Sequence, residues 1–157
     1  MLTARVRALC GPAMEFRRLG GLRDSALSTP LRERLQVDDE TCLLRDVEFC
    51  ASGERIVFAQ TVLPASTLGH YPWLHELGDS PLGEALRQVD APLEREPLEY
   101  AELPAGHPLA EAARVVTGDT SMWARRAVYR PGGLPILVHE VFLPGLLRVQ
   151  ASARSHT

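Results

Sequence analysis

Residues 43–49 read LLRDVEF and residues 136–142 read ILVHEVF, and these two stretches decide the fold. In both, apolar side chains recur at every second position, which is typical of half-buried strands. The alternation puts Arg45 on the apolar face of the first strand and Glu140 on the apolar face of the second. Burying an unpaired charge costs several kcal/mol, so such side chains usually have a partner. Either Arg45 and Glu140 pair with each other, or together they hold a small polar ligand. A shifted strand register, with Arg45 at an exposed edge, is the simpler alternative.

Each of the two stretches belongs to a predicted β-hairpin. Turn residues join the first two predicted strands into one hairpin and the last two into another. A fifth strand lies between the two hairpins. The predicted strands are residues 41–50, 55–63, 98–103, 122–129 and 135–143.

Helices are predicted before the first hairpin and between the two hairpins. Ser66 or Thr67 is expected to cap one short helix, and Ser80 to cap the next, with Pro81 at its first position. Residues 20–40 leave two options open, a short helix from Thr29-Pro30 or a strand over 31–37. Other helices are predicted at residues 2–10, 12–19 and 107–116, a loop at 88–97, and a frayed tail at 148–157. Hairpins with helices grouped between them predict a single α+β domain over residues 1–157 with an antiparallel sheet.

The composition is that of an ordinary globular domain. The chain has 157 residues, of which 45% are hydrophobic and 24% charged, and its net charge is −3. The acidic balance and the lack of a basic block argue against a nucleic-acid surface. No apolar run reaches membrane-spanning length, and the first residues lack the apolar core of a signal peptide, so a cytoplasmic location is expected.

The cysteines and histidines show no metal-ligand spacing, so no metal site is predicted. Cys42 and Cys50 lie too far apart in one extended run to form a disulfide, and with Cys10 they are expected to be reduced thiols. His139 follows Val138 and points to the opposite side from Glu140, so a surface or interface position is expected. The residues alone therefore predict an α+β domain and leave two options for its inward charges, a buried ion pair between Arg45 and Glu140 or a small anion held between the two hairpins.

Five segments together resemble the chorismate pyruvate-lyase (4-hydroxybenzoate synthase) family in order and approximate spacing. The best-matched core runs over residues 41–144. The segments are LRDVEFCASGE at 44–54, TVLPASTL at 61–68, LGDSPLG at 77–83, WARR at 123–126 and GLPILVHEVFLP at 133–144.

The resemblance implies a roughly six-stranded antiparallel sheet whose buried site is covered by helical flaps. It also implies a carbon–oxygen lyase that converts chorismate to 4-hydroxybenzoate and pyruvate, the entry step of ubiquinone synthesis. The enzyme would act as a monomer and without a metal or other cofactor. The chain departs from the family by lacking helical sequence before the first flap.

The family's site residues fall on matching positions of this chain. The resemblance implies that Arg45 binds the ring carboxylate and that Glu140 lies near the ring hydroxyl. It implies a backbone contact from Leu82 and a contact from Met14 on the first flap. Chorismate has a second carboxylate on its enolpyruvyl group, for which Arg125 or Arg126 is the candidate cation; these two point to opposite sides of one strand.

Two other functions remain open. The effector-binding domains of some GntR-type regulators are similar to this fold, so a non-catalytic sensor of small aromatic or anionic ligands is the main alternative. A related enzyme that releases another hydroxybenzoate is the other.

Overall fold

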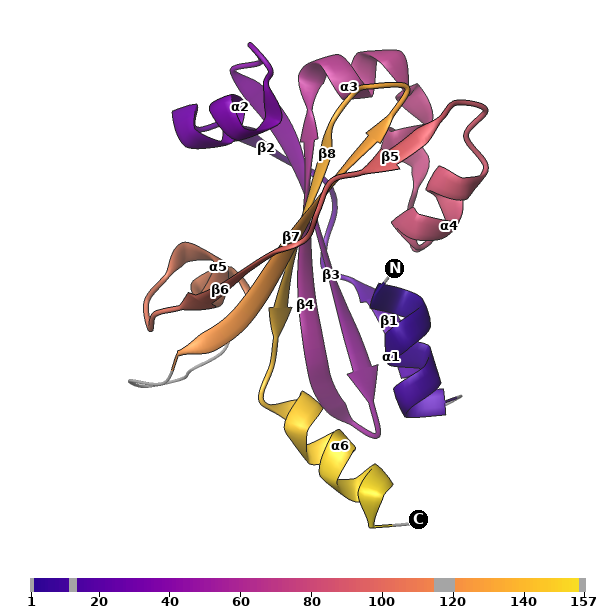
Figure 1. Ribbon diagram of the computed structural model, residues 1–157, viewed down its shortest axis with the longest axis vertical. Coiled ribbons are helices and arrows are strands. Elements are labelled where there is room, and N and C mark those ends of the chain that lie inside the picture. Colours follow the sequence, from indigo (N-terminus) through magenta and orange to yellow (C-terminus); the bar gives the residue numbers. More distant parts are fainter. Residues whose placement is uncertain (1, 12–13, 115–120, 156–157) are drawn as a thin grey trace.

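The computed structural model describes residues 2–11, 14–114 and 121–155, and one curved antiparallel sheet dominates it (Figure 1). Helices flank the sheet on both sides, which confirms the predicted α+β class. The elements are α1 (Leu2–Cys10), β1 (Met14–Arg18), β2 (Arg23–Ala26), α2 (Thr29–Leu35), β3 (Thr41–Ala51), β4 (Glu54–Pro64), α3 (Ala65–His70), η2 (Pro72–Glu76), α4 (Leu82–Arg87), β5 (Leu93–Arg95), β6 (Glu99–Leu103), α5 (Pro108–Ala112), β7 (Met122–Pro131), β8 (Ile136–Phe142) and α6 (Gly145–Arg154).

The two predicted hairpins form the centre of the sheet. Within the described residues the strand order is β1-β3-β4-β8-β7-β5, with β2 also paired to β3 and β6 also paired to β7. The sheet therefore has eight strands rather than about six. The additional strands are short segments that line up along the edges of the long hairpins.

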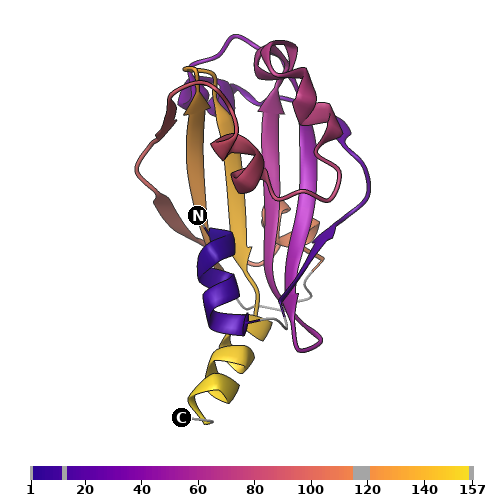
Figure 2. The same cartoon turned by 90° about the vertical axis from the view of Figure 1, so that its right-hand side faces the viewer.

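The two faces of the sheet are covered by different helices. The front face carries Arg45, Val47, Ala59 and Val138, and its upper half packs against α3, η2 and α4. Helix α1 covers its lower part through Val6, and Figure 2 shows α4 and α1 in front of the strands.

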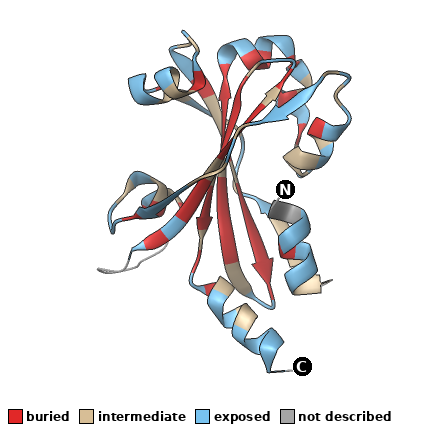
Figure 3. Cartoon of the chain, viewed as in Figure 1, coloured by how far each residue is buried: buried red, intermediate tan, exposed pale blue. Residues whose placement is uncertain are grey.

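The back face carries Phe58, Val62, Leu137 and Val141 and packs against α2 and α5. Both layers depend on the two-residue period of the strands, because successive side chains enter opposite layers. Figure 3 shows buried residues concentrated along the central strands.

The helix predicted over residues 12–19 is wrong where the structure describes it, because Met14–Arg18 forms strand β1. Its side chains alternate between half-buried and exposed, and the strand pairs antiparallel with β3. The Phe16 ring contacts the Phe49 ring edge-on at 5.4 Å between centroids. Pairing with a long strand and this aromatic contact outweigh the weak helical pattern of so short a segment.

Several boundaries differ from the sequence predictions. Ser28 caps α2, so the helical option for residues 29–35 is right and the strand over 31–37 is not. Ser66 and Thr67 lie inside α3 rather than capping it, and no side chain caps α4, so the cap at Ser80 is also wrong.

Two further segments differ in extent. The loop predicted over 88–97 contains the short strand β5. Helix α5 is shorter than the predicted 107–116, whose last two residues lie outside the described part of the chain.

The tail predicted to be frayed, residues 148–157, is instead helical as far as Arg154, as part of α6. Arg148 of this helix donates to both carboxylate oxygens of Glu54, at 3.0 and 2.9 Å. At Gly145 an added Cβ would lie 2.3 Å from the Arg55 carbonyl oxygen, so the absent side chain lets the helix start against β4. Ion pairing and close backbone approach thus hold the segment to the hairpin turn.

Candidate functional site

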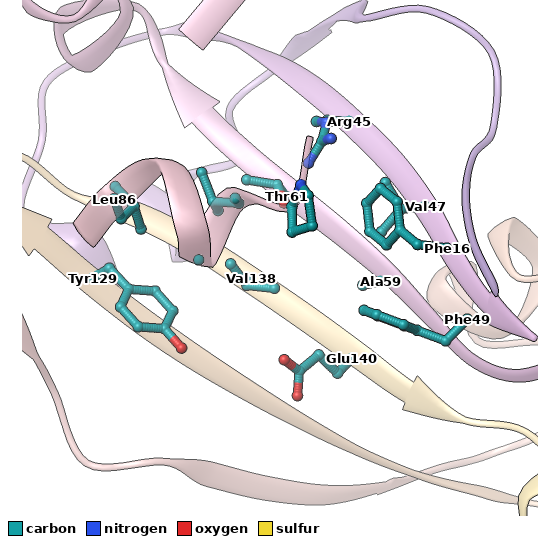
Figure 4. A pocket seen from close by; sticks show the side chains of 13 residues that line it. Phe16, Arg45, Val47, Phe49, Ala59, Thr61, Leu86, Tyr129, Val138 and Glu140 are labelled. Carbon is teal, nitrogen blue, oxygen red and sulfur yellow. The ribbon is translucent and has the colours of Figure 1, made fainter. Parts of the chain in front are cut away.

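A small cavity of about 60 Å³ lies between the front face of the sheet and the start of α4 (Figure 4). Strands β1, β3, β4, β7 and β8 supply its floor, and residues 81–83 with Leu86 supply the cover. Most of the lining is apolar, and the two predicted site residues, Arg45 and Glu140, both line it. The lining residues are Phe16, Arg45, Val47, Phe49, Ala59, Thr61, Pro81, Leu82, Gly83, Leu86, Tyr129, Val138 and Glu140.

Arg45 is a buried cation held by backbone carbonyls. Its side chain lies opposite Thr61 in the β3–β4 register, and the residue is 2% exposed. Nη2 donates to the carbonyl oxygens of Gly78 at 3.0 Å and Ser80 at 2.7 Å. The guanidinium also lies 5.7 Å from the centre of the Phe16 ring, an arrangement that favours a cation. These contacts fix the fork of Arg45 at the edge of the cavity.

No carboxylate of the described residues forms an ion pair with Arg45. Asp79 acts on it only at longer range and instead contacts Arg18 at 3.6 Å. The buried Nε of Arg45 has no hydrogen-bond partner within the described structure. Burial, with a smaller contribution from the charge of Arg18, lowers the pKa of Arg45 from its ordinary value. Within the described part of the chain, the cavity thus contains a positive charge that has no carboxylate in ion-pair contact.

The carbonyls that hold Arg45 come from the turn between η2 and α4. Gly78 has a φ of +54°, in the left-handed region that glycine adopts without a side-chain penalty. This turn reverses the chain and directs two carbonyl oxygens to one guanidinium nitrogen. The segment LGDSPLG therefore forms both the anchor of Arg45 and the first turn of the cavity cover.

Glu140 faces the same cavity from β8 and is 6% exposed. It lies directly opposite Arg125 of β7, whose Nε donates to the Glu140 carboxylate. Burial raises the pKa of Glu140 above its ordinary value, and the hydrogen bond and charge of Arg125 oppose that shift. This carboxylate is therefore desolvated yet oriented by a fixed donor.

The two candidate cations for the second carboxylate lie on opposite sides of β7, as their spacing predicts. Arg125 is on the front face and pairs with Glu140. Arg126 is on the back face and donates to Glu99 at 2.9 Å. Arg125 alone of the two is at the site, and its charge is already matched by a carboxylate.

Leu82 and Met14 have different relations to the cavity. Leu82 lines it from the first position of α4, where the backbone N–H has no acceptor within the helix. Met14 lies on β1 rather than on a helical flap, packs into the cluster around Phe49, and is not among the lining residues. Phe16, two residues along the same strand face, lines the cavity instead.

Tyr129 was not predicted as a site residue, although it lines the cavity between Leu86 and Glu140 (Figure 4). It lies four residues after Arg125 on one strand, and an even spacing places both on the same face. That spacing was the available signal.

A larger hollow lies on the back face between α2 and α5 and contains His139. This histidine is half-buried, and its Nδ1 has no partner within the described residues. Burial lowers the pKa of His139 to about 4, with smaller contributions from Arg126 and His107. His139 is neutral at physiological pH and does not reach the cavity of Glu140.

Two features are absent from the described residues. No three His, Cys, Asp or Glu side chains there gather into a group that could hold a metal ion. No helix there is long and apolar enough to cross a membrane. The three cysteines form no disulfide with one another.

Comparisons with known proteins point to one family. The model of a family described as chorismate lyase matches residues 1–151. A probable chorismate pyruvate-lyase of Methylococcus capsulatus is 38% identical over 97% of this chain and 94% of its own length. One from Cupriavidus metallidurans is 35% identical over 93% and 70% of the two chains. One from Thiobacillus denitrificans is 40% identical over 69% of this chain, but the match spans only 59% of that relative.

Among solved structures, the fold is similar to ligand-binding domains of GntR-family regulators. One from Bordetella bronchiseptica has a TM-score of 0.61 at 14% identity and covers 83% of this chain and 84% of that domain. The C-terminal domain of a histidine utilization repressor from Pseudomonas syringae has a TM-score of 0.63 at 13% identity and covers 84% and 92% of the two chains. At such low identity these likenesses show the fold alone.

Proposed function

The chain belongs to the chorismate lyase family, and from this membership we propose that it converts chorismate to 4-hydroxybenzoate and pyruvate. The observation that carries the proposal is that Arg45 is buried, has no carboxylate partner among the described residues, and lies in one cavity with Glu140. The resemblance that implies this reaction also implies the entry step of ubiquinone synthesis, a monomer and no cofactor.

Arg45 is the proposed site for the ring carboxylate. A guanidinium can hold a carboxylate through two parallel hydrogen bonds, which fixes the plane of the ring as well as its position. An incoming carboxylate would compensate the buried charge and provide the acceptor that Nε lacks. The backbone N–H of Leu82 is the proposed second donor to this end of the substrate. The contact from Met14 stays a prediction that the cavity lining does not support.

The Glu140 carboxylate is the proposed hydrogen-bond partner of the ring hydroxyl. Chorismate carries this hydroxyl on the ring carbon opposite its carboxylate, so one ring can span from Arg45 to Glu140. The cavity of about 60 Å³ is smaller than the roughly 150 Å³ known to hold a benzene ring. We therefore expect the cover formed by residues 81–83 to move outward when substrate enters.

The proposed reaction is an elimination that makes the ring aromatic. The bond between the ring carbon and the ether oxygen breaks, and the electron pair stays on that oxygen as the enolate of pyruvate. The hydrogen on the neighbouring, hydroxyl-bearing ring carbon leaves as a proton. The enolate then takes up a proton at its methylene carbon, which balances the products 4-hydroxybenzoate and pyruvate.

Glu140 has two proposed roles in this elimination. It either accepts the departing ring proton or accepts a hydrogen bond from the ring hydroxyl and orients the ring. General-base help is typically worth about 10²–10⁴ in rate, whereas orientation can contribute more. Because aromatisation is strongly downhill, we propose that orientation dominates.

The second candidate function is a non-catalytic sensor, favoured by the fold it shares with GntR-family ligand-binding domains. One experiment separates the two. The purified chain is incubated with chorismate, and pyruvate and 4-hydroxybenzoate are followed together. Equal release of both supports the lyase, and tight chorismate binding without turnover supports the sensor. If the chain neither bound chorismate nor turned it over, both the lyase and the sensor function would be contradicted.

A further inference from the structure

The phenol side chain of Tyr129 points into the cavity, and the reaction proposed above assigns no role to it. Figure 4 shows its hydroxyl pointing toward the Glu140 carboxylate. The residue is 6% exposed, yet its hydroxyl makes no hydrogen bond with the part of the chain that the structure describes. The other buried tyrosine, Tyr71, donates to the Pro131 carbonyl oxygen at 3.0 Å, as buried phenols usually do. Among the described residues, the Tyr129 hydroxyl is thus a donor without an acceptor.

Arg95 is the cation nearest to Tyr129 in the strand register. It lies directly opposite Tyr129 in the β5–β7 pair, so both side chains leave the same face of the sheet. Strand β5 is an edge strand, and Arg95 is exposed there. It forms no ion pair with any described residue, whereas Arg125 and Arg126 each have a carboxylate partner.

Burial raises the pKa of the Tyr129 phenol, with Glu140 adding to the shift and both Arg95 and Arg125 opposing it. The phenol therefore keeps its proton at neutral pH and can donate it. The opposing contribution of Arg95 agrees with a guanidinium on the same side of the sheet as the hydroxyl.

The chemistry of chorismate requires polar contacts at this end of the cavity. Its enolpyruvyl ether is attached to the ring carbon next to the hydroxyl-bearing carbon. With the ring carboxylate at Arg45 and the hydroxyl at Glu140, the enolpyruvyl group leaves the ring at the Glu140 end. Its carboxylate needs a cation there, and its ether oxygen takes up negative charge when the carbon–oxygen bond breaks.

We propose that Tyr129 and Arg95 form the subsite for the enolpyruvyl group, an inference that rests on the lyase function proposed above. Tyr129 donates a hydrogen bond to the ether oxygen, which strengthens as that oxygen becomes an enolate. Arg95 binds the enolpyruvyl carboxylate from the edge of the sheet. The product 4-hydroxybenzoate lacks the enolpyruvyl group and therefore touches neither residue through this subsite.

The test compares chorismate turnover with 4-hydroxybenzoate binding in Tyr129→Phe and Arg95→Met. A hydrogen bond to a charged group is lost in each case, so kcat/KM for chorismate should fall about tenfold or more. For Arg95→Met the loss should appear mainly in KM, and for Tyr129→Phe mainly in kcat, because charge on the ether oxygen develops in the transition state. The Kd for 4-hydroxybenzoate should stay within about twofold of wild type.

Arg5→Met is the matched control, because Arg5 is an exposed arginine on α1 that does not line the cavity. It should change neither quantity. Unchanged kcat/KM in both Tyr129→Phe and Arg95→Met of an active enzyme would overturn the subsite and leave the lyase function intact. Equal losses in turnover and in 4-hydroxybenzoate affinity would show a structural role and also overturn it. A wild-type chain that releases no pyruvate would overturn the proposed function, and the subsite with it.

Discussion

Arg45 and Glu140 line one cavity, and within the described structure they do not bond to each other. Arg45 donates to two backbone carbonyls of the turn before α4, whereas Glu140 accepts from Arg125. The buried ion pair that would have explained both residues without a ligand is therefore absent. Other protein groups, the two carbonyls and Arg125, hold the two charged side chains in place. The cavity between the two is lined mainly by apolar side chains. This arrangement suits a ligand with an anionic end and a hydrogen-bonding end.

The first prediction contrasts two buried arginines. Arg125→Met removes one partner of a buried pair and leaves the Glu140 carboxylate uncompensated, which typically costs about 3–5 kcal/mol in the free energy of unfolding. Arg45→Met removes a buried charge that has no carboxylate partner, so the desolvation relieved offsets the hydrogen bonds lost. Its free energy of unfolding should lie within about 1 kcal/mol of wild type. Urea unfolding without ligand measures both; a loss at Arg45 as large as at Arg125 would mean that Arg45 is structural.

The second prediction concerns ligand recognition by the fork of Arg45. Arg45→Lys keeps the charge but loses the two parallel hydrogen bonds, so 4-hydroxybenzoate should bind about tenfold to a hundredfold more weakly. Isothermal titration calorimetry gives the Kd, and Arg5→Met serves again as the exposed control. Wild-type affinity in Arg45→Lys would place the carboxylate elsewhere.

The third prediction separates the two roles of Glu140. Glu140→Gln keeps a hydrogen-bond acceptor of the same shape but removes the base. If orientation dominates, kcat with chorismate should fall by about tenfold or less. A decrease of about 10³ or more, with the Kd for 4-hydroxybenzoate unchanged, would instead assign Glu140 as the base.

The fourth prediction concerns stability in acid. The pKa of His139 in the folded protein, about 4, lies below its ordinary 6.5, so the unfolded chain takes up the proton first as pH falls. The stabilising contribution is complete above about pH 6.5 and is lost as pH falls toward 4. Because the side chain is half-buried, we expect about 1–2 kcal/mol of loss between pH 7.5 and pH 5.

His139→Thr removes the titration and keeps a residue suited to a strand. The gap in free energy of unfolding between wild type and this variant should shift against wild type across the same pH range. Because Arg126 and His107 contribute to the shift, Arg126→Met should reduce this pH dependence. If the difference in free energy of unfolding between wild type and His139→Thr did not change with pH, the lowered pKa of His139 in the folded protein would be contradicted.

The sequence predicts the centre of the fold better than its edges. The long hairpins follow from a two-residue period over many positions, and that period also places Arg45 and Glu140 on one face. The short strands β2 and β5 read RDSA and LER, which carry no such period. They are strands because β3 and β7 offer backbone partners, and that information lies elsewhere in the chain.

For the site, too, some features could be predicted from the sequence and others could not. The faces of Arg45, Arg125 and Glu140 could be predicted, but the partner of each could not. The pairing of Arg125 with Glu140 follows from the β7–β8 register, which the turn at residues 130–134 determines in three dimensions. The carbonyls that hold Arg45 come from a turn more than thirty residues away, so no local pattern reports them.

We propose that Arg45 and Glu140 bind opposite ends of one hydroxybenzoate ring. A crystal structure of the chain with 4-hydroxybenzoate is the decisive measurement. We expect the carboxylate on the Arg45 guanidinium, the hydroxyl within hydrogen-bond distance of Glu140, and residues 81–83 displaced outward. A ring bound outside this cavity, or bound with its hydroxyl at Arg45 and its carboxylate at Glu140, would contradict it.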